Sequence, residues 1–314
     1  MTDELAGLKI GHATVDGFFT GCTVFLCPEG TVGSVDTRGP APGSRETALM
    51  AIDKPVHFIN ALLLSGGSAF GLGAADGVMR YLAERNIGHP TVIRPVPIVP
   101  AAIIFDLFLT EGKAFPTADT AYAACMNAAE HDIAQGNVGA GIGATVGKWA
   151  MNGAFMKGGF GLASYSEGGL VVGAAAVVNA IGDVLGPDGQ VLAGAPNLQG
   201  GWMVENDPFR RFPDAPPVQL GTNTTLVVVY TNARLDKVES NRLAQRAHDG
   251  LAIAIRPVHS THDGDIAFAL ATNRVNAGFD LVANISVEIV AEAIRNAVRF
   301  ADSIGPITGL GNKR

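Results

Sequence analysis

The strongest constraint on the fold is a set of short, almost wholly apolar runs that glycine or proline residues bound. Residues 225–231, with the sequence TLVVVYT, are apolar enough to be buried on both faces of a sheet. Runs of this length that are rich in β-branched residues are typical of strands, whereas buried helices are longer. The expected strands are residues 20–27, 31–35, 169–179, 225–231 and 266–271.

Longer segments with apolar residues at helical spacing lie among these runs and predict helices. The expected helices are residues 67–84, 117–134, 235–253 and 286–302. A further helix is expected to start within residues 44–51, with Ser44 as its N-cap and Thr47 at the capping-box position. The 40 glycines and 17 prolines supply tight turns. Residues 205–221 hold four prolines and most of the local charge, so we expect a solvated loop there. This pattern predicts an α/β protein.

The charge balance narrows the class of partner. Only 16% of the residues are charged, the net charge is −7, and no cluster of basic residues is longer than Arg210-Arg211. Nucleic-acid binding needs a concentrated positive surface, so neither a nucleic acid nor another anionic partner is expected. With 47% apolar residues the chain can bury a large core and also some surface in a homo-oligomer.

The lack of a secretory signal and the pattern of cysteines predict a cytoplasmic location. Residues 1–20 carry acids early and have no basic segment followed by an apolar one, as a secretory signal would. No apolar run approaches the roughly 18 residues of a membrane-spanning helix. Cys22, Cys27 and Cys125 are odd in number and have no CxxC spacing, so we expect buried thiols and neither a disulfide nor zinc.

Three glycine-containing motifs resemble known functional loops but lack a residue or a context that those loops require. In Leu64-Ser65-Gly66-Gly67-Ser68-Ala69-Phe70 a phenylalanine stands where a nucleophile elbow needs its second glycine. Residues 139–144, GAGIGA, follow a polar segment and lack the later acid of a dinucleotide site. Gly147-Lys148 lacks the first glycine of a phosphate-binding loop. These glycines are better explained by close approach of backbones around a site.

Residues 259–265, HSTHDGD, gather two imidazoles and two carboxylates. One interpretation is a metal site, although the following glycine and strand argue against the helix that would align the histidines. A second is a polar turn that enters a strand. A third is that Asp263 and Asp265, two residues apart and so on one side of the strand entrance, orient a nucleophile elsewhere.

The Asn223–Thr224 bond is where such a nucleophile fits. A proline-rich arm precedes it, and an apolar strand follows that would fix the threonine hydroxyl. A threonine that becomes an N-terminus needs no histidine, because its own α-amine, with an ordinary pKa of about 7.7–8, can accept the hydroxyl proton. The sequence offers no convincing Ser-His-Asp or Cys-His arrangement instead.

Six stretches, in order, carry a resemblance to a known family. They are VDTRG with PGSRET after it, LSGGSAFGL, NVGAGIGATVGKW, VVNAIG, GTNTTLVVVYTNA and PVHSTHDGDIAFALAT. The chain resembles the DmpA-like aminopeptidases and nylon-oligomer hydrolases, N-terminal-nucleophile amidases made as one inactive precursor that cuts itself in two. The resemblance implies a layered αββα sandwich shared with the ornithine acetyltransferases. It also implies one domain over residues 1–314, self-cleaved into an α chain of residues 1–223 and a β chain of residues 224–314.

The resemblance also assigns the residues that react. Thr224 is expected to be the nucleophile, and Asn223 the residue whose carbonyl is attacked during self-cleavage. Asn179 matches the asparagine that donates to the oxyanion in the family, and its amide NH₂ can supply that hydrogen bond.

Lys148 matches the catalytic-site lysine of the nylon-oligomer hydrolases, where a cation would keep the nucleophile's amine neutral and stabilise negative charge. Asp263 and Asp265 match the two aspartates near the nucleophile in those same enzymes and are expected to hydrogen-bond the Thr224 hydroxyl or amine. The β-aminopeptidase branch has a serine and a glutamate there. The family often has a tyrosine where this chain has Phe105, so that hydroxyl donor is missing here.

The expected function is therefore a self-processing threonine amide hydrolase that cleaves linear amides, most like an endohydrolase of 6-aminohexanoate (nylon) oligomers. Three alternatives stay open: an aminopeptidase for short, D- or β-peptides, an acyltransferase like the ornithine acetyltransferases, and a non-catalytic scaffold with an intact chain. The expected partner is a small amide or oligoamide substrate, without cofactor, metal or membrane. The expected assembly is a homo-oligomer of αβ units, such as a tetramer.

Overall fold

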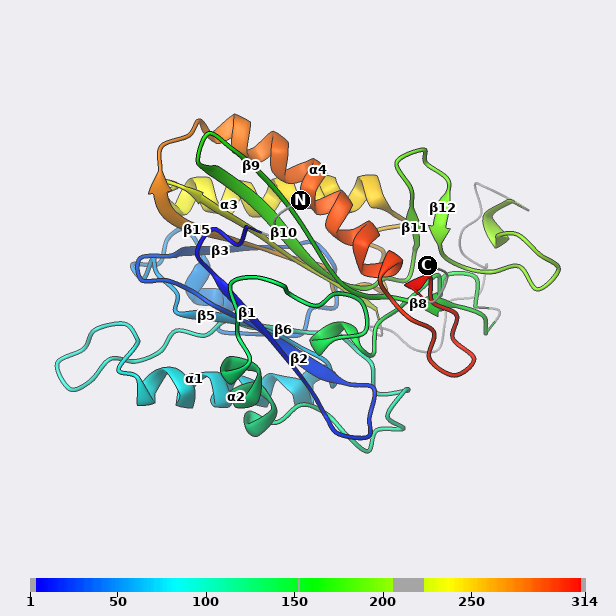
Figure 1. Ribbon diagram of the computed structural model, residues 1–314, viewed down its shortest axis with the longest axis horizontal. Coiled ribbons are helices and arrows are strands. Elements are labelled where there is room, and N and C mark those ends of the chain that lie inside the picture. The colour runs from blue at the N-terminus through cyan, green and yellow to red at the C-terminus, as the bar shows by residue number, and fades with distance from the viewer. Residues whose placement is uncertain (1–3, 152, 206–222, 312–314) are drawn as a thin grey trace.

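The computed structural model describes residues 4–151, 153–205 and 223–311. Two five-stranded sheets stack face to face, and each carries helices on its outer face (Figure 1). The expected layered αββα sandwich is thus confirmed.

The sheet that carries the candidate nucleophile has the order β3-β15-β13-β10-β9. Its strands are β3 (Val32–Thr37), β9 (Gly159–Glu167), β10 (Leu170–Asn179), β13 (Thr224–Ala233) and β15 (Ile266–Val275). β13 is central: it pairs antiparallel with β10 and parallel with β15. All ten residues of both β10 and β13 are buried, as their apolar sequences predict.

The second sheet has the order β1-β2-β5-β6-β4. Its strands are β1 (Lys9–Thr14), β2 (Gly21–Leu26), β5 (Ala61–Ser65), β6 (Ala101–Ile103) and β4 (Ser44–Arg45). Two small sheets, β7 (Thr145–Val146) with β8 (Met156–Lys157), and β12 (Val191–Ala193) with β11 (Asp183–Leu185) and β14 (Ile255–Arg256), lie beyond the ends of β9 and β10.

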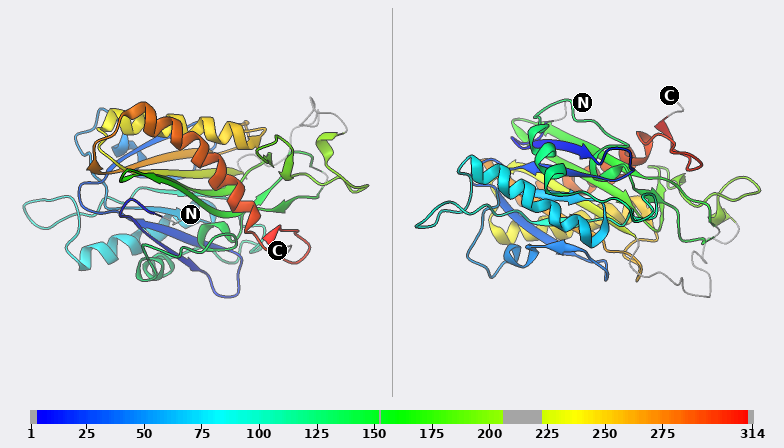
Figure 2. Two further views of the ribbon diagram at one scale, coloured as in Figure 1. Left: turned by 45° about the horizontal axis from the view of Figure 1, so that its top comes forward. Right: turned by 90° about the horizontal axis from the view of Figure 1, so that it is seen from below.

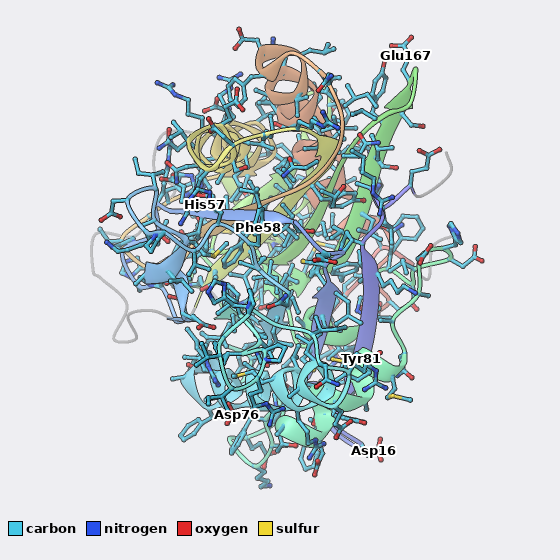
Figure 3. The ribbon with its side chains drawn as sticks, turned by 90° about the vertical axis from the view of Figure 1, so that its left-hand side faces the viewer. Asp16, His57, Phe58, Asp76, Tyr81 and Glu167 are labelled. Atoms are coloured by element: carbon cyan, nitrogen blue, oxygen red, sulfur yellow. The ribbon has the colours of Figure 1, made fainter. Side chains whose placement is uncertain are left out.

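Four α-helices complete the outer layers. α3 (Lys237–Ala254) and α4 (Phe279–Arg299) cover the first sheet, and α1 (Ala75–Glu84) and α2 (Ala118–Met126) cover the second (Figure 2). Successive side chains of a strand point to opposite faces, so alternate residues of β13 fill two cores. Val227 and Val229 face α3 and α4, whereas Leu226 and Val228 face the other sheet. Figure 3 shows these layers end-on, with Asp76 and Tyr81 of α1 in one outer layer and Glu167 at the tip of β9.

Most expected elements are present, with four differences. The helix expected over residues 67–84 is a 3₁₀ helix, Ser68–Ala74, followed by α1 from Ala75. The expected helix at residues 44–51 is instead the short strand β4 followed by a 3₁₀ turn, Thr47–Met50, and the Ser44 hydroxyl lies 3.1 Å from that of Thr47. α2 does begin after the capping residue Thr117 but ends at Met126, well before residue 134. α4 begins at Phe279, seven residues before the expected start.

Three further sequence expectations concern a loop, a strand and a membrane-spanning helix. The expected loop at residues 205–221 lies, apart from Glu205, outside the described residues. β9 was not expected, because its sequence, GFGLASYSE, mixes apolar and polar residues. No helix in the described ranges is both long and apolar enough to cross a membrane.

Candidate active site

Three strand ends meet where β13 begins. Thr224 is the first residue of β13 and lies opposite Asn179, the last residue of β10, in the antiparallel register. On the other side, Asn223 forms a parallel bridge with Asp263, just before β15. Thr224 is only 3% exposed. The topology therefore brings residues 179, 223–224 and 263–265 together at one end of the first sheet, near β11 in Figure 1.

The carbonyl of Asn223 receives two hydrogen bonds in the unbroken chain. The Thr224 hydroxyl donates to this oxygen at 2.5 Å, and the Gly264 backbone N–H donates to it at 2.9 Å. Gly264 must be a glycine here, because a Cβ at this position would lie 2.7 Å from the Thr224 hydroxyl oxygen. The hydroxyl thus lies beside the peptide bond expected to break, and a backbone donor already binds its carbonyl.

The amide of Asn179 is held in one orientation. Its Oδ1 accepts from the Thr145 backbone N–H at 3.1 Å and from Lys148 Nζ at 2.9 Å, and its Nδ2 donates to the Phe105 carbonyl at 3.1 Å. The Thr145 hydroxyl donates to Oδ1 as a third group at 3.4 Å, so the NH₂ group is turned the other way, as an oxyanion donor needs. Phe105 thus contacts the site through its backbone, at the position where the family often has a tyrosine.

Lys148 binds the end of β10 twice. Its ammonium donates to Asn179 Oδ1 and, at 3.2 Å, to the Asn179 backbone carbonyl. Burial lowers the pKa of Lys148 to about 7, and the negative charge of Asp263 opposes this shift. The residue can therefore exist in either protonation state near neutral pH.

Asp263 is buried in a cage of donors. Its Oδ2 accepts from the Ser260 hydroxyl at 2.6 Å and the Ser260 N–H at 3.1 Å, and its Oδ1 accepts from the Ile181 N–H at 3.4 Å. Burial and the neighbouring Asp265 carboxylate raise the pKa of Asp263.

Asp265 binds the residue after the candidate nucleophile. Its Oδ1 accepts from the Thr225 N–H at 2.7 Å, and its Oδ2 lies 2.9 Å from His259 Nδ1. Its backbone carbonyl accepts from the N–H groups of Arg38 and Gly39, at the end of the VDTRG motif. In this form the Thr224 hydroxyl donates to Asn223, so direct hydrogen bonds from the Thr224 hydroxyl or amine to the two aspartates stay a prediction.

Sequence reasoning did not assign the buried pair Lys157 and Asp106. Lys157 Nζ donates to the carbonyls of Gly141, Ala144 and Gly158 at 2.8–3.0 Å. Burial lowers its pKa to about 7, Asp106 opposes this, and Lys148 adds to it, so the two lysines interact. A lone lysine in a two-residue strand carries no sequence signal that could have indicated this.

His259 belongs to the 259–265 cluster, and its sequence context indicates no role of its own. The metal interpretation of that cluster finds no support: within the described ranges, no group of three His, Cys, Asp or Glu side chains is arranged to hold an ion. The cluster is instead a turn into β15 whose carboxylates bind backbone N–H groups, Ser260 and His259.

Comparison with known proteins supports the family resemblance. Residues 1–310 match the model of peptidase family S58. An "uncharacterized aminopeptidase" of Mycobacterium leprae is 42% identical over 301 residues, which cover 87% of this chain and 79% of that protein. The 6-aminohexanoate-oligomer endohydrolase of Paenarthrobacter ureafaciens is 31% identical over 278 residues, covering 87% and 75%.

Solved structures show the same fold at lower identity. A Burkholderia β-aminopeptidase superposes with a TM-score of 0.72 at 19% identity, covering 99% of this chain and 89% of that one. The L-aminopeptidase D-Ala-esterase/amidase of Ochrobactrum anthropi, described as a variant of the Ntn hydrolase fold, gives a TM-score of 0.73 at 20% identity, covering 97% and 89%.

Proposed function

The chain belongs to peptidase family S58 and is an amide-bond hydrolase, and from this premise we propose that Thr224 is its nucleophile, freed when the chain cuts itself between Asn223 and Thr224. The observation that carries the proposal is the short contact between the Thr224 hydroxyl and the Asn223 carbonyl, to which the Gly264 N–H also donates.

The self-cleavage follows from this contact. The Thr224 hydroxyl oxygen attacks the Asn223 carbonyl carbon, and the Gly264 N–H stabilises the negative charge that develops on the carbonyl oxygen. The C–N bond then breaks, the hydroxyl proton ends on the departing nitrogen, and Asn223 is left as an ester of Thr224. Water hydrolyses the ester, which restores the hydroxyl and leaves Thr224 with a free α-amine.

The mature site then acts on other amides by the same chemistry. The α-amine accepts the hydroxyl proton as the oxygen attacks the substrate carbonyl, and the Asn179 amide donates to the oxyanion. The amine passes the proton to the leaving nitrogen, and water completes the reaction through the acyl-enzyme. Lys148, as a cation, disfavours protonation of the amine and stabilises the negative charge.

The substrate class that we propose is a linear oligoamide of ω-amino acids, cut internally. Lys148 and the Asp263-Gly264-Asp265 turn are the features in which this chain resembles the nylon-oligomer branch. A second candidate is an aminopeptidase for short peptides, favoured by the 42% identity to a relative that carries that name. The two differ in whether the substrate needs a free amine beside the cleaved bond.

A matched pair of substrates distinguishes the endohydrolase from the aminopeptidase. We expect the purified enzyme to cleave a linear 6-aminohexanoate tetramer and its N-acetylated form at rates within roughly tenfold, because an endo-acting site does not bind the terminal ammonium. An aminopeptidase would cleave the N-acetylated substrate slower by a far larger factor. Its buried group that binds the terminal ammonium would then have no partner. Product masses from either substrate show which bond is cut. Amide products that increase with an added amine would indicate acyl transfer.

The assembly of αβ units into a homo-oligomer and the cytoplasmic location also stay proposals. The assembly is favoured by the low charge content and by two exposed apolar side chains, Val92 at 100% and Ile93 at 87%.

A further inference from the structure

Two histidines continue the hydrogen bonds of Asp265 away from the candidate nucleophile. His259 Nδ1 lies 2.9 Å from Asp265 Oδ2, and His259 Nε2 lies 3.2 Å from His248 Nδ1. His248, on α3, places its Nε2 3.1 Å from the backbone carbonyl of Asp36, at the end of β3. We call Asp265, His259, His248 and Asp36 the histidine row.

The direction of each hydrogen bond in the row is fixed from its far end. A backbone carbonyl only accepts, so His248 Nε2 must carry a proton for Asp36. His248 is 1% exposed, and burial lowers its pKa to about 4, so it is neutral and its Nδ1 is an acceptor. His259 Nε2 must then donate to His248 Nδ1.

This leaves a proton to be placed between His259 and Asp265. If His259 were neutral, its Nδ1 would carry a lone pair that faces the Asp265 carboxylate at 2.9 Å, and two acceptors at this distance repel. Both oxygens of Asp265 accept a backbone N–H, Oδ1 from Thr225 at 2.7 Å and Oδ2 from His259 at 3.1 Å, and such donors favour the ionised carboxylate. His259 as an imidazolium, with both nitrogens donating, satisfies every contact in the row.

We propose, resting on the function proposed above, that His259 is a positioning residue held as an imidazolium by the histidine row, and that it neutralises Asp265 so that the Thr224 amine stays free to accept a proton. Asp265 binds the N–H of Thr225, one residue from that amine. A bare carboxylate so near favours the ammonium form, in which the amine cannot act as a base. The imidazolium at 2.9 Å offsets this charge.

Other charges around the row do not replace His259. Asp263 approaches the same loop through Ser260 and adds negative charge only where it is ionised, and Lys148 lies on the β10 side. Asp36 is already paired with Arg38 at 3.0 Å. The imidazolium is thus the cation bound directly to Asp265 in the described part of the chain.

The pH profile of the His259→Asn variant tests the proposed role of His259 in catalysis. Asparagine can donate to Asp265 from Nδ2, as Nδ1–H does, but carries no charge. We expect the acid limb of kcat/KM to move up by roughly one pH unit, so that activity falls about tenfold on that limb, while the plateau at higher pH stays within about threefold of the parent. His57→Asn, an exposed histidine at the opposite end of the sheet, is the control and should leave the profile unchanged (Figure 3). A loss that is equal at all pH values would contradict the proposal.

The protonation state of His259 can be measured without an activity assay. In uniformly ¹⁵N-labelled Thr224→Ala protein at pH 7.5, we expect one histidine of the seven to show both ring nitrogens protonated, and that signal to vanish in the added His259→Asn variant. A neutral His259 would overturn the proposal even if the enzyme hydrolyses amides as proposed. An imidazolium in a protein that hydrolyses no amide would refute the proposed function while leaving the row intact.

Discussion

The Thr224→Ala protein is expected to remain one unbroken chain of about 32.4 kDa and to lose amide hydrolysis by a factor on the order of 10⁴ or more. Without the hydroxyl, the Asn223 carbonyl has no internal nucleophile, so neither the ester nor the free amine can form. A denaturing gel and a rate assay measure the two losses separately.

Two variants distinguish chemistry from packing. Thr225→Val removes a neighbouring buried hydroxyl that hydrogen-bonds no group in the described ranges, and should be cut and active like the parent. Thr224→Ser keeps a hydroxyl and can gain an amine, so it should recover cleavage and part of the hydrolysis. Efficient cleavage of Thr224→Ala at the same bond would exclude Thr224 as the nucleophile.

The Asn179→Ala protein is expected to lose roughly 10²–10³ in kcat with a smaller change in KM, because an oxyanion donor acts on charge that exists only in the transition state. Steady-state kinetics on the matched oligoamide pair measure this. The variant also leaves Lys148 and the Thr145 N–H without Oδ1, so its melting temperature must be measured beside its rate.

Asn232→Ala is the matched control for this loss. Asn232 is a buried asparagine near the opposite end of β13, where it binds the backbone of Val171 and Gly169. Its replacement should lower the melting temperature and leave kcat within about threefold. If Asn232→Ala lowered kcat as much as Asn179→Ala, the assigned oxyanion role would be wrong.

The strands around the site could be predicted from sequence, but their pairing could not. The runs at 169–179 and 225–231 are apolar on both faces, which predicts burial but carries no information on register. The register places Asn179 beside Thr224, and before the structure only the family resemblance linked these residues. The helix predicted for residues 44–51 is not formed, which shows the limit of capping signals. Ser44 and Thr47 do contact each other, yet pairing with β6 makes Ser44 part of a strand.

The charges behind the site were the least predictable part. His248 meets Asp36, which lies 212 residues earlier in the chain, and only the packing of α3 on β3 brings them together. Lys157 donates to two carbonyls of the glycine-rich loop, those of Gly141 and Ala144, and to that of Gly158, whereas the sequence pattern of this loop indicates only a close approach of backbones. Local sequence patterns report propensity and burial, whereas these contacts depend on the complete fold.

Self-cleavage before Thr224 is tested most directly by the intact mass and N-terminal sequence of the fragments in the purified wild-type protein. We expect two chains, of which the smaller holds the last 91 residues (314 − 223) and begins Thr-Thr-Leu-Val-Val. A single unbroken chain that hydrolyses amides, or a small fragment that begins at any other residue, would exclude Thr224 as the nucleophile that self-cleavage frees.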